Sequence, residues 1–189
     1  MGECRVLGSC WEGYSGGILR RDLEASRRVA LSRRRSALSI FIAHSRAQVD
    51  HARSLQQALN LFDFPSCLDV IDMSEGRECS EVCAEIDEGF ERATHFVVLV
   101  TSDYLSKSSR YCQYEINKLI NFDESRAGKV LLVKDSSCND SEFDKFSRGH
   151  FVVEELQCSV FDSGSPEAFS SAVKVVVEFL DSFDESIQS

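Results

Sequence analysis

A glutamate stands within the apolar face of a predicted helix, and its type and position suit it to chemistry. The segment 111–120 reads YCQYEINKLI. At about 100° per residue, Cys112, Ile116 and Leu119 share one stripe. Glu115 falls inside that stripe, where burial of an unpaired carboxylate costs several kcal/mol or shifts its pKa. The pattern leaves open a structural ion pair, a rim position at the helix end, or a functional site.

Alternating strands and helices must position this glutamate. We predict strands at 38–43, 67–71, 95–100, 129–133 and 158–161. Helices are predicted at 48–62, 80–93, 111–120 and after Ser165, which is read as an N-cap before Pro166, whereas 135–150 reads as polar and irregular. This alternation predicts an α/β fold, with a central parallel five-stranded sheet flanked by helices on both faces.

Three loops of this fold are expected to meet at one edge of the sheet: 43–47, 72–79 and 101–110. Ligands of such sheets bind beyond the carboxyl ends of the strands, where the strand order reverses. Glu115 lies about one turn into the helix that follows the last of these loops. The sequence therefore predicts a crevice with an acid beside it.

Charge is divided unevenly along the 189 residues, whose formal net charge is −10. Residues 1–36 hold eight Lys+Arg against four Asp+Glu, a net of +4, and the remainder carries −14. An acidic body repels phosphate backbones, which argues against nucleic-acid binding by the domain. No apolar run approaches the roughly 20 residues that span a bilayer, so we expect no membrane contact.

The eight cysteines are read as small core hydrophobes rather than as a secreted disulfide scaffold. Zinc binding is the weaker reading because no CxxC pair occurs and the histidines are scattered. We therefore expect no metal and a reducing, cytoplasmic location.

The chain divides into three parts. Residues 1–36 are read as a basic N-terminal extension, loop-like over 11–17 and helical over 19–35, with no assignable chemistry. The domain occupies 37–183, and 184–189 form a C-terminal tail. Because the strand pattern is complete from Ala37, a chain starting near Ser36 should fold, and Arg33, Arg34 and Arg35 should lie on the surface.

Residues 37–183 resemble the TIR (Toll/interleukin-1 receptor) domain family. SIFIAHS (39–45) is similar to its first-strand signature, and 72–116 is similar to its middle. That middle contains a BB loop with a glycine, a helix, a strand, a polar turn, and a helix bearing a glutamate followed by an aliphatic residue. The resemblance implies the flavodoxin-like TIR fold.

TIR domains that cleave NAD⁺ use a glutamate on this helix as the catalytic residue. The resemblance implies that Glu115, which matches its position, has this role. The substrate-binding residues implied are His44, Ser45, Arg46, Arg77, Ser102, Tyr104 and Tyr111. Tyr111 stands where tryptophan is usual, and His44 where tyrosine is usual. Both arginines are equally well read as solvated loop charges, His44 as a hydrogen-bonding strand-end residue, and Ser102 and Tyr104 as loop-capping residues.

The leading hypothesis is therefore an NAD⁺ nucleosidase of the immune or anti-phage type. It would release nicotinamide and ADP-ribose, or a cyclic ADP-ribose-type signal that a separate effector reads. NAD⁺ is the substrate, and no cofactor is expected. Self-association is expected through the BB-loop residues Asp72, Ser74, Glu75, Gly76 and Arg77. The alternative is a non-catalytic TIR adaptor, because fold alone does not settle activity.

Two further readings come from related folds. A response-regulator-like receiver needs an acidic pair after its first strand, and Ala43, His44 and Ser45 provide none. A nucleoside-deoxyribosyltransferase-like enzyme pairs a related fold with a catalytic glutamate.

Overall fold

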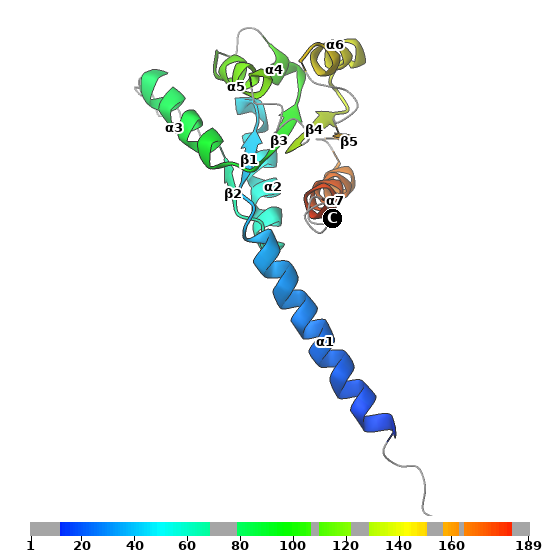
Figure 1. Cartoon of the computed structure of the whole chain (residues 1–189). Coiled ribbons are helices and arrows are strands. Elements are labelled where there is room, and N and C mark those ends of the chain that lie inside the picture. Colours follow the sequence, from blue (N-terminus) through cyan, green and yellow to red (C-terminus); the bar gives the residue numbers. More distant parts are fainter. Residues whose placement is uncertain are drawn as a thin grey trace, which may run out of the picture.

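Five parallel strands form the centre of the molecule (Figure 1). The computed structural model describes residues 12–68, 79–106, 110–121, 129–150, 157–162 and 165–182. The strands are β1 (Ile40–Ala43), β2 (Ser66–Leu68), β3 (His95–Val100), β4 (Val130–Asp135) and β5 (Gln157–Phe161). They are ordered β2-β1-β3-β4-β5, and every neighbouring pair is parallel. The predicted five-stranded parallel sheet is confirmed, and its strand order reverses between β1 and β3.

Helices cover both faces of this sheet (Figure 1). On one face lie α2 (Val49–Leu61), which follows the short 3-10 helix η1 (Arg46–Gln48), and α7 (Pro166–Ser182). On the other face lie α3 (Cys79–Arg92), α4 (Ser102–Leu105), α5 (Arg110–Ile120) and α6 (Asp140–His150). The candidate glutamate therefore lies on the face covered by four helices.

Alternate residues of the strands supply two separate cores. In β1, Ile40 and Ile42 pack toward α2 and α7, whereas Phe41 and Ala43 pack toward the opposite helices. Strands buried on both faces read as continuous apolar runs, which explains why β1 and β3 are recognisable from sequence. Gly89 lets α3 approach the sheet closely, because an added Cβ would lie 2.7 Å from Cε2 of Phe41.

The end of the chain follows the predicted capping pattern. The Ser165 hydroxyl accepts a hydrogen bond from the Ala168 backbone N–H at 3.2 Å, and α7 begins at Pro166. A serine N-cap followed by proline in the first turn is a favoured helix start. This prediction is confirmed.

Helix α6 corrects the reading of 135–150 as irregular, because residues 140–150 are helical. Asn139 caps the helix: its side-chain oxygen accepts from the Ser141 N–H at 2.8 Å. Phe143 and Phe146 are spaced one turn apart, and both side chains pack in the core with only 8% and 7% of their surfaces exposed. These two aromatic side chains give the otherwise polar helix its apolar contact with the core.

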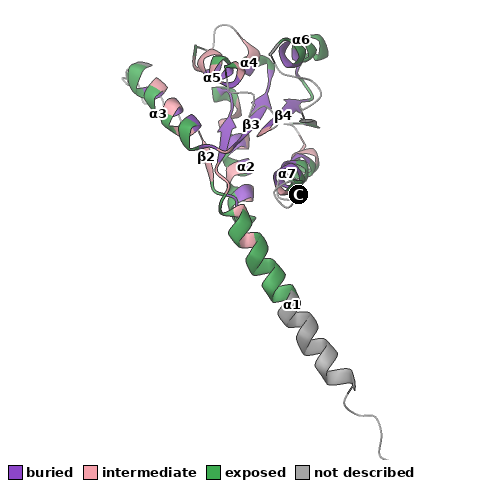
Figure 2. Cartoon of the chain, viewed as in Figure 1, coloured by how far each residue is buried: buried purple, intermediate pink, exposed green. Residues whose placement is uncertain are grey.

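Helix α1 (Glu12–Arg35) runs away from the sheet, and its described side chains are mostly exposed (Figures 1 and 2). The prediction of a loop over 11–17 is wrong from Glu12 onward. Once a helix is nucleated, each further residue adds one hydrogen bond, so loop-like residues can continue it.

Arg35 corrects a second expectation, because its side chain is 15% exposed rather than on the surface. Its guanidinium donates to both carboxylate oxygens of Asp181 on α7, at 2.9 and 2.6 Å. It also stacks 5.0 Å from the ring centre of Phe64. Arg33 and Arg34 are exposed as expected. The last residue of α1 thus belongs to the folded domain.

Within the described residues, the structure contains no helix that is both long and apolar enough to cross a membrane.

Candidate functional site

Glu115 lies on the inner face of α5, and only 1% of its surface is exposed. The other buried residues of this helix are Cys112, Ile116 and Leu119. The predicted apolar stripe with a carboxylate inside it is therefore present. Its depth places the carboxylate beneath the surface in this conformation.

The carboxyl ends of β1 and β3 meet beside α5. The hydroxyls of Ser45, after β1, and Thr101, after β3, are 3.4 Å apart. The Cys112 thiol on α5 lies 3.8 Å from the backbone oxygen of His44. Cys112 and Glu115 are one turn apart on α5, so the glutamate lies beside the sheet edge where the strand order reverses.

His44 is buried, with 8% of its surface exposed, and its ring turns back on its own strand. Its Nδ1 lies 3.4 Å from the Ile42 backbone oxygen, which accepts the hydrogen bond. Burial lowers the pKa of His44 below its ordinary value; that hydrogen bond opposes the shift, and the charge of Arg53 adds to it. The imidazole is therefore neutral at pH 7 and contributes no positive charge to the site.

The remaining predicted substrate-binding residues differ widely in burial. Arg46 begins η1 and is exposed, as is Ser102 at the start of α4. Tyr111 is half-buried and packs against the core, whereas Tyr104 is fully buried in it. A side chain with no exposed surface cannot contact a ligand without a rearrangement. The predicted roles of these residues in substrate binding stay predictions.

The BB-loop residues Asp72, Ser74, Glu75, Gly76 and Arg77 lie outside the described residues. The substrate-binding role of Arg77 and the self-association role of the loop therefore stay predictions as well.

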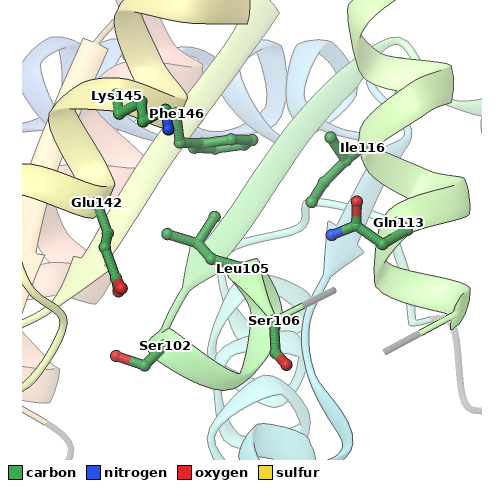
Figure 3. A pocket seen from close by; sticks show the side chains of 8 residues that line it. All are labelled: Ser102, Leu105, Ser106, Gln113, Ile116, Glu142, Lys145 and Phe146. Atoms are coloured by element: carbon green, nitrogen blue, oxygen red, sulfur yellow. The ribbon is translucent and has the colours of Figure 1, made fainter. Parts of the chain in front are cut away.

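A cavity of about 490 Å³ opens between α4, α5 and α6 (Figure 3). Ser102 is the predicted site residue that lines it. Apolar walls come from Leu105, Ile116 and Phe146, and polar groups come from Ser106, Gln113, Glu142 and Lys145. Glu115 is not among the lining residues, although the adjacent Ile116 is.

Thr101 is a residue that our sequence reasoning missed. Its hydroxyl contacts Ser45 and also accepts the Tyr104 backbone N–H at 3.1 Å, so it caps α4. A threonine directly after a strand and before a short polar segment is a recognisable N-cap signal. Applying that rule to TSDYL would have placed Thr101 at the sheet edge.

Residues 40–169, from β1 into α7, match the family model described as the TIR domain. The chain belongs to the TIR domain family. A search of the curated proteins found no match. The matched region of this TIR domain includes the reversal of strand order and Glu115. TIR domains generally self-associate through contacts between TIR domains.

Proposed function

We propose that this TIR domain cleaves the bond between nicotinamide and ribose in NAD⁺, with Glu115 as the catalytic carboxylate. The observation that carries the proposal is the burial of Glu115 beside the strand-order reversal, where ligands of such sheets bind. Buried acids in such positions are functional-site candidates.

The reaction needs only one carboxylate. When the bond between ribose C1′ and the ring nitrogen breaks, the electron pair goes to nicotinamide, which leaves as a neutral molecule without a proton. Positive charge then develops on the ribose, and an ionised Glu115 would stabilise it. Water adds to C1′ and releases a proton to give ADP-ribose, or an adenine nitrogen of the same molecule adds and closes a ring. The second carboxylic acid of glycosidases is not required.

Access to Glu115 requires movement. Because the side chain is 1% exposed, NAD⁺ can reach it only if neighbouring loops open. Self-association through the BB loop is the trigger that we propose, so that the product, a signal for a separate effector in an immune or defence pathway, forms only in the assembled state.

The same burial favours a second candidate function. A carboxylate that never becomes accessible would be structural, and the domain would then act as a non-catalytic adaptor through TIR contacts. The two functions differ in whether NAD⁺ is consumed.

The test is NAD⁺ turnover by the full chain over a wide range of protein concentrations, with the products identified by mass spectrometry. Glu115→Gln is nearly isosteric, so the fold should persist while turnover falls by about 10²-fold or more. Glu178→Gln is the matched control, because Glu178 is an exposed acid on α7, which covers the other face of the sheet. Equal turnover by the wild type and Glu115→Gln at every concentration would contradict the proposal.

A further inference from the structure

Asp87 on α3 binds two side chains of α5. The Tyr114 hydroxyl donates to its carboxylate at 2.8 Å, and the Lys118 ammonium lies 2.5 Å from the same oxygen. Tyr114 and Lys118 are one turn apart and therefore project from the same side of α5. The ammonium also lies 5.7 Å from the Tyr114 ring centre and 6.0 Å from that of Phe90. We call Asp87, Tyr114 and Lys118 the α3–α5 clamp.

The clamp is held in its bonded protonation state at neutral pH. Burial alone would raise the pKa of Asp87, but the hydrogen bonds from Lys118 and Tyr114 outweigh it and lower that pKa. The bond to Asp87 raises the pKa of Tyr114 to about 12, so the phenol stays protonated and donates. Hydrogen bonds to an ionised carboxylate are stronger than neutral ones.

The clamp acts on one flank of α5, where Tyr114 and Lys118 also line a hollow of about 460 Å³. The cavity of about 490 Å³ lies against the opposite flank. Gln113 and Ile116 face the cavity between α5 and α6 (Figure 3). The apolar stripe holds α5 on the sheet, and hollows lie beside the helix on both flanks. The polar contacts with α3 are therefore well placed to fix how far α5 is rotated about its axis.

Glu115 directly follows Tyr114, so any rotation of α5 turns its carboxylate. We propose that Asp87 is a positioning residue, which sets the direction of Glu115 by holding Tyr114 and Lys118. The expected effect of Asp87 on the reaction rate rests on the proposed NAD⁺ cleavage. Its effect on the orientation of α5 does not.

The expected change is in kcat rather than in KM. Displacing a catalytic group by about 1 Å can cost about 10²-fold in rate, so a partial rotation should cost roughly tenfold. Glu115 acts on charge that develops in the transition state, and substrate binding should change little. Asp87→Ala should therefore lower kcat by about tenfold and change KM by less than about twofold.

Glu88→Ala is the matched control. Glu88 is the next residue of α3 and forms its ion pair with Arg92 of the same helix, so its loss changes the same charge without touching α5. Tyr114→Phe removes one bond of the clamp and should give a smaller loss than Asp87→Ala. Asp87→Asn keeps an acceptor for Tyr114 and should restore part of kcat.

Hydrogen exchange of the α5 amides supplies a readout that does not need activity. Asp87→Ala should speed exchange within 110–121, whereas Glu88→Ala should not. Identical exchange in the two variants would overturn the proposal, as would a kcat loss without altered exchange or altered exchange without a kcat loss. If the wild type turned over no NAD⁺, the proposed function would fail, and exchange alone would decide whether the clamp holds α5.

Discussion

His44 and His95 lie buried near opposite ends of neighbouring strands, with 8% and 3% of their surfaces exposed. The rings of His95 and Phe179 on α7 are nearly perpendicular, with ring centres 6.5 Å apart, and Nδ1 of His95 lies 3.0 Å from the Thr94 hydroxyl. Burial lowers the pKa of His95 from 6.5 to about 4, and the charge of Lys129 adds to the shift. At the scale of single residues, protonation of this buried histidine at acidic pH therefore opposes folding.

The pH dependence of stability follows from the sign of this shift. Below pH 6.5 the unfolded chain binds a proton at His95, whereas the folded chain binds it only near pH 4. The free energy of unfolding is thus unaffected above pH 6.5 and falls as the pH drops, by up to about 3 kcal/mol from this residue. Urea unfolding of His95→Gln should show a shallower loss between pH 6.5 and 4 than the wild type. A slope identical to that of the wild type would show that His95 is not the group responsible.

Among the secondary elements, α1 and α7 are joined by the Arg35–Asp181 ion pair. The guanidinium also lies against Phe62 and Phe64, 5.8 and 5.0 Å from their ring centres. A bidentate arginine–carboxylate ion pair that is partly buried is stronger than an ordinary surface ion pair. The last turn of α1 is therefore in contact with the body of the domain through Arg35.

Shortening the chain tests that contact. A chain that begins at Ser36 should still unfold cooperatively, but with a free energy of unfolding lower by about 1–2 kcal/mol because the ion pair and ring contacts are lost. Arg35→Ala in the full chain should cost about the same, whereas Arg33→Ala, at an exposed position, should cost less than about 0.5 kcal/mol. Thermal unfolding measures all three. Equal melting temperatures for Arg35→Ala and the wild type would contradict this account.

Elements with strong local signals could be predicted from the sequence, and those fixed by distant contacts could not. The apolar run of β3 and the Ser165–Pro166 helix start are found where expected because their causes are local. Helix α6 was not predicted because two phenylalanines in a polar segment give little periodic signal. The role of Arg35 depends on a residue 146 positions away, which no local pattern reveals.

The candidate site divides in the same way. Helical periodicity placed Glu115 within the apolar stripe and left a rim position at the helix end open; the structure shows that the side chain is buried. The clamp partner Asp87 lies on another helix, and its pairing with Tyr114 arises only when α3 and α5 pack together.

At the scale of the whole molecule, the buried glutamate and the family's self-association together predict that activity depends on assembly. Arg77 is the single positive charge among the BB-loop acids Asp72, Glu75 and Glu78. Since an acidic body resists random clustering, we propose that specific contacts of this loop bring copies together.

Arg77→Glu should weaken both assembly and NAD⁺ turnover and leave the melting temperature of the monomer nearly unchanged. Sedimentation and turnover measured across a dilution series would show the two effects together. Lys174→Glu makes the same charge change on an exposed residue of α7 and should alter neither. Constant specific activity in a protein shown to be monomeric would rule out dependence on assembly.

The direction of the parallel strands has a mechanical consequence. Helix α1 enters β1 at the amino edge of the sheet, and α7 returns to that edge, where Asp181 meets Arg35. Glu115 stands beside the opposite edge, at the carboxyl ends of β1 and β3. A linker or fused protein joined to either helix would therefore lie at the amino edge of the sheet. The opposite edge, beside the glutamate, would stay free to contact another copy.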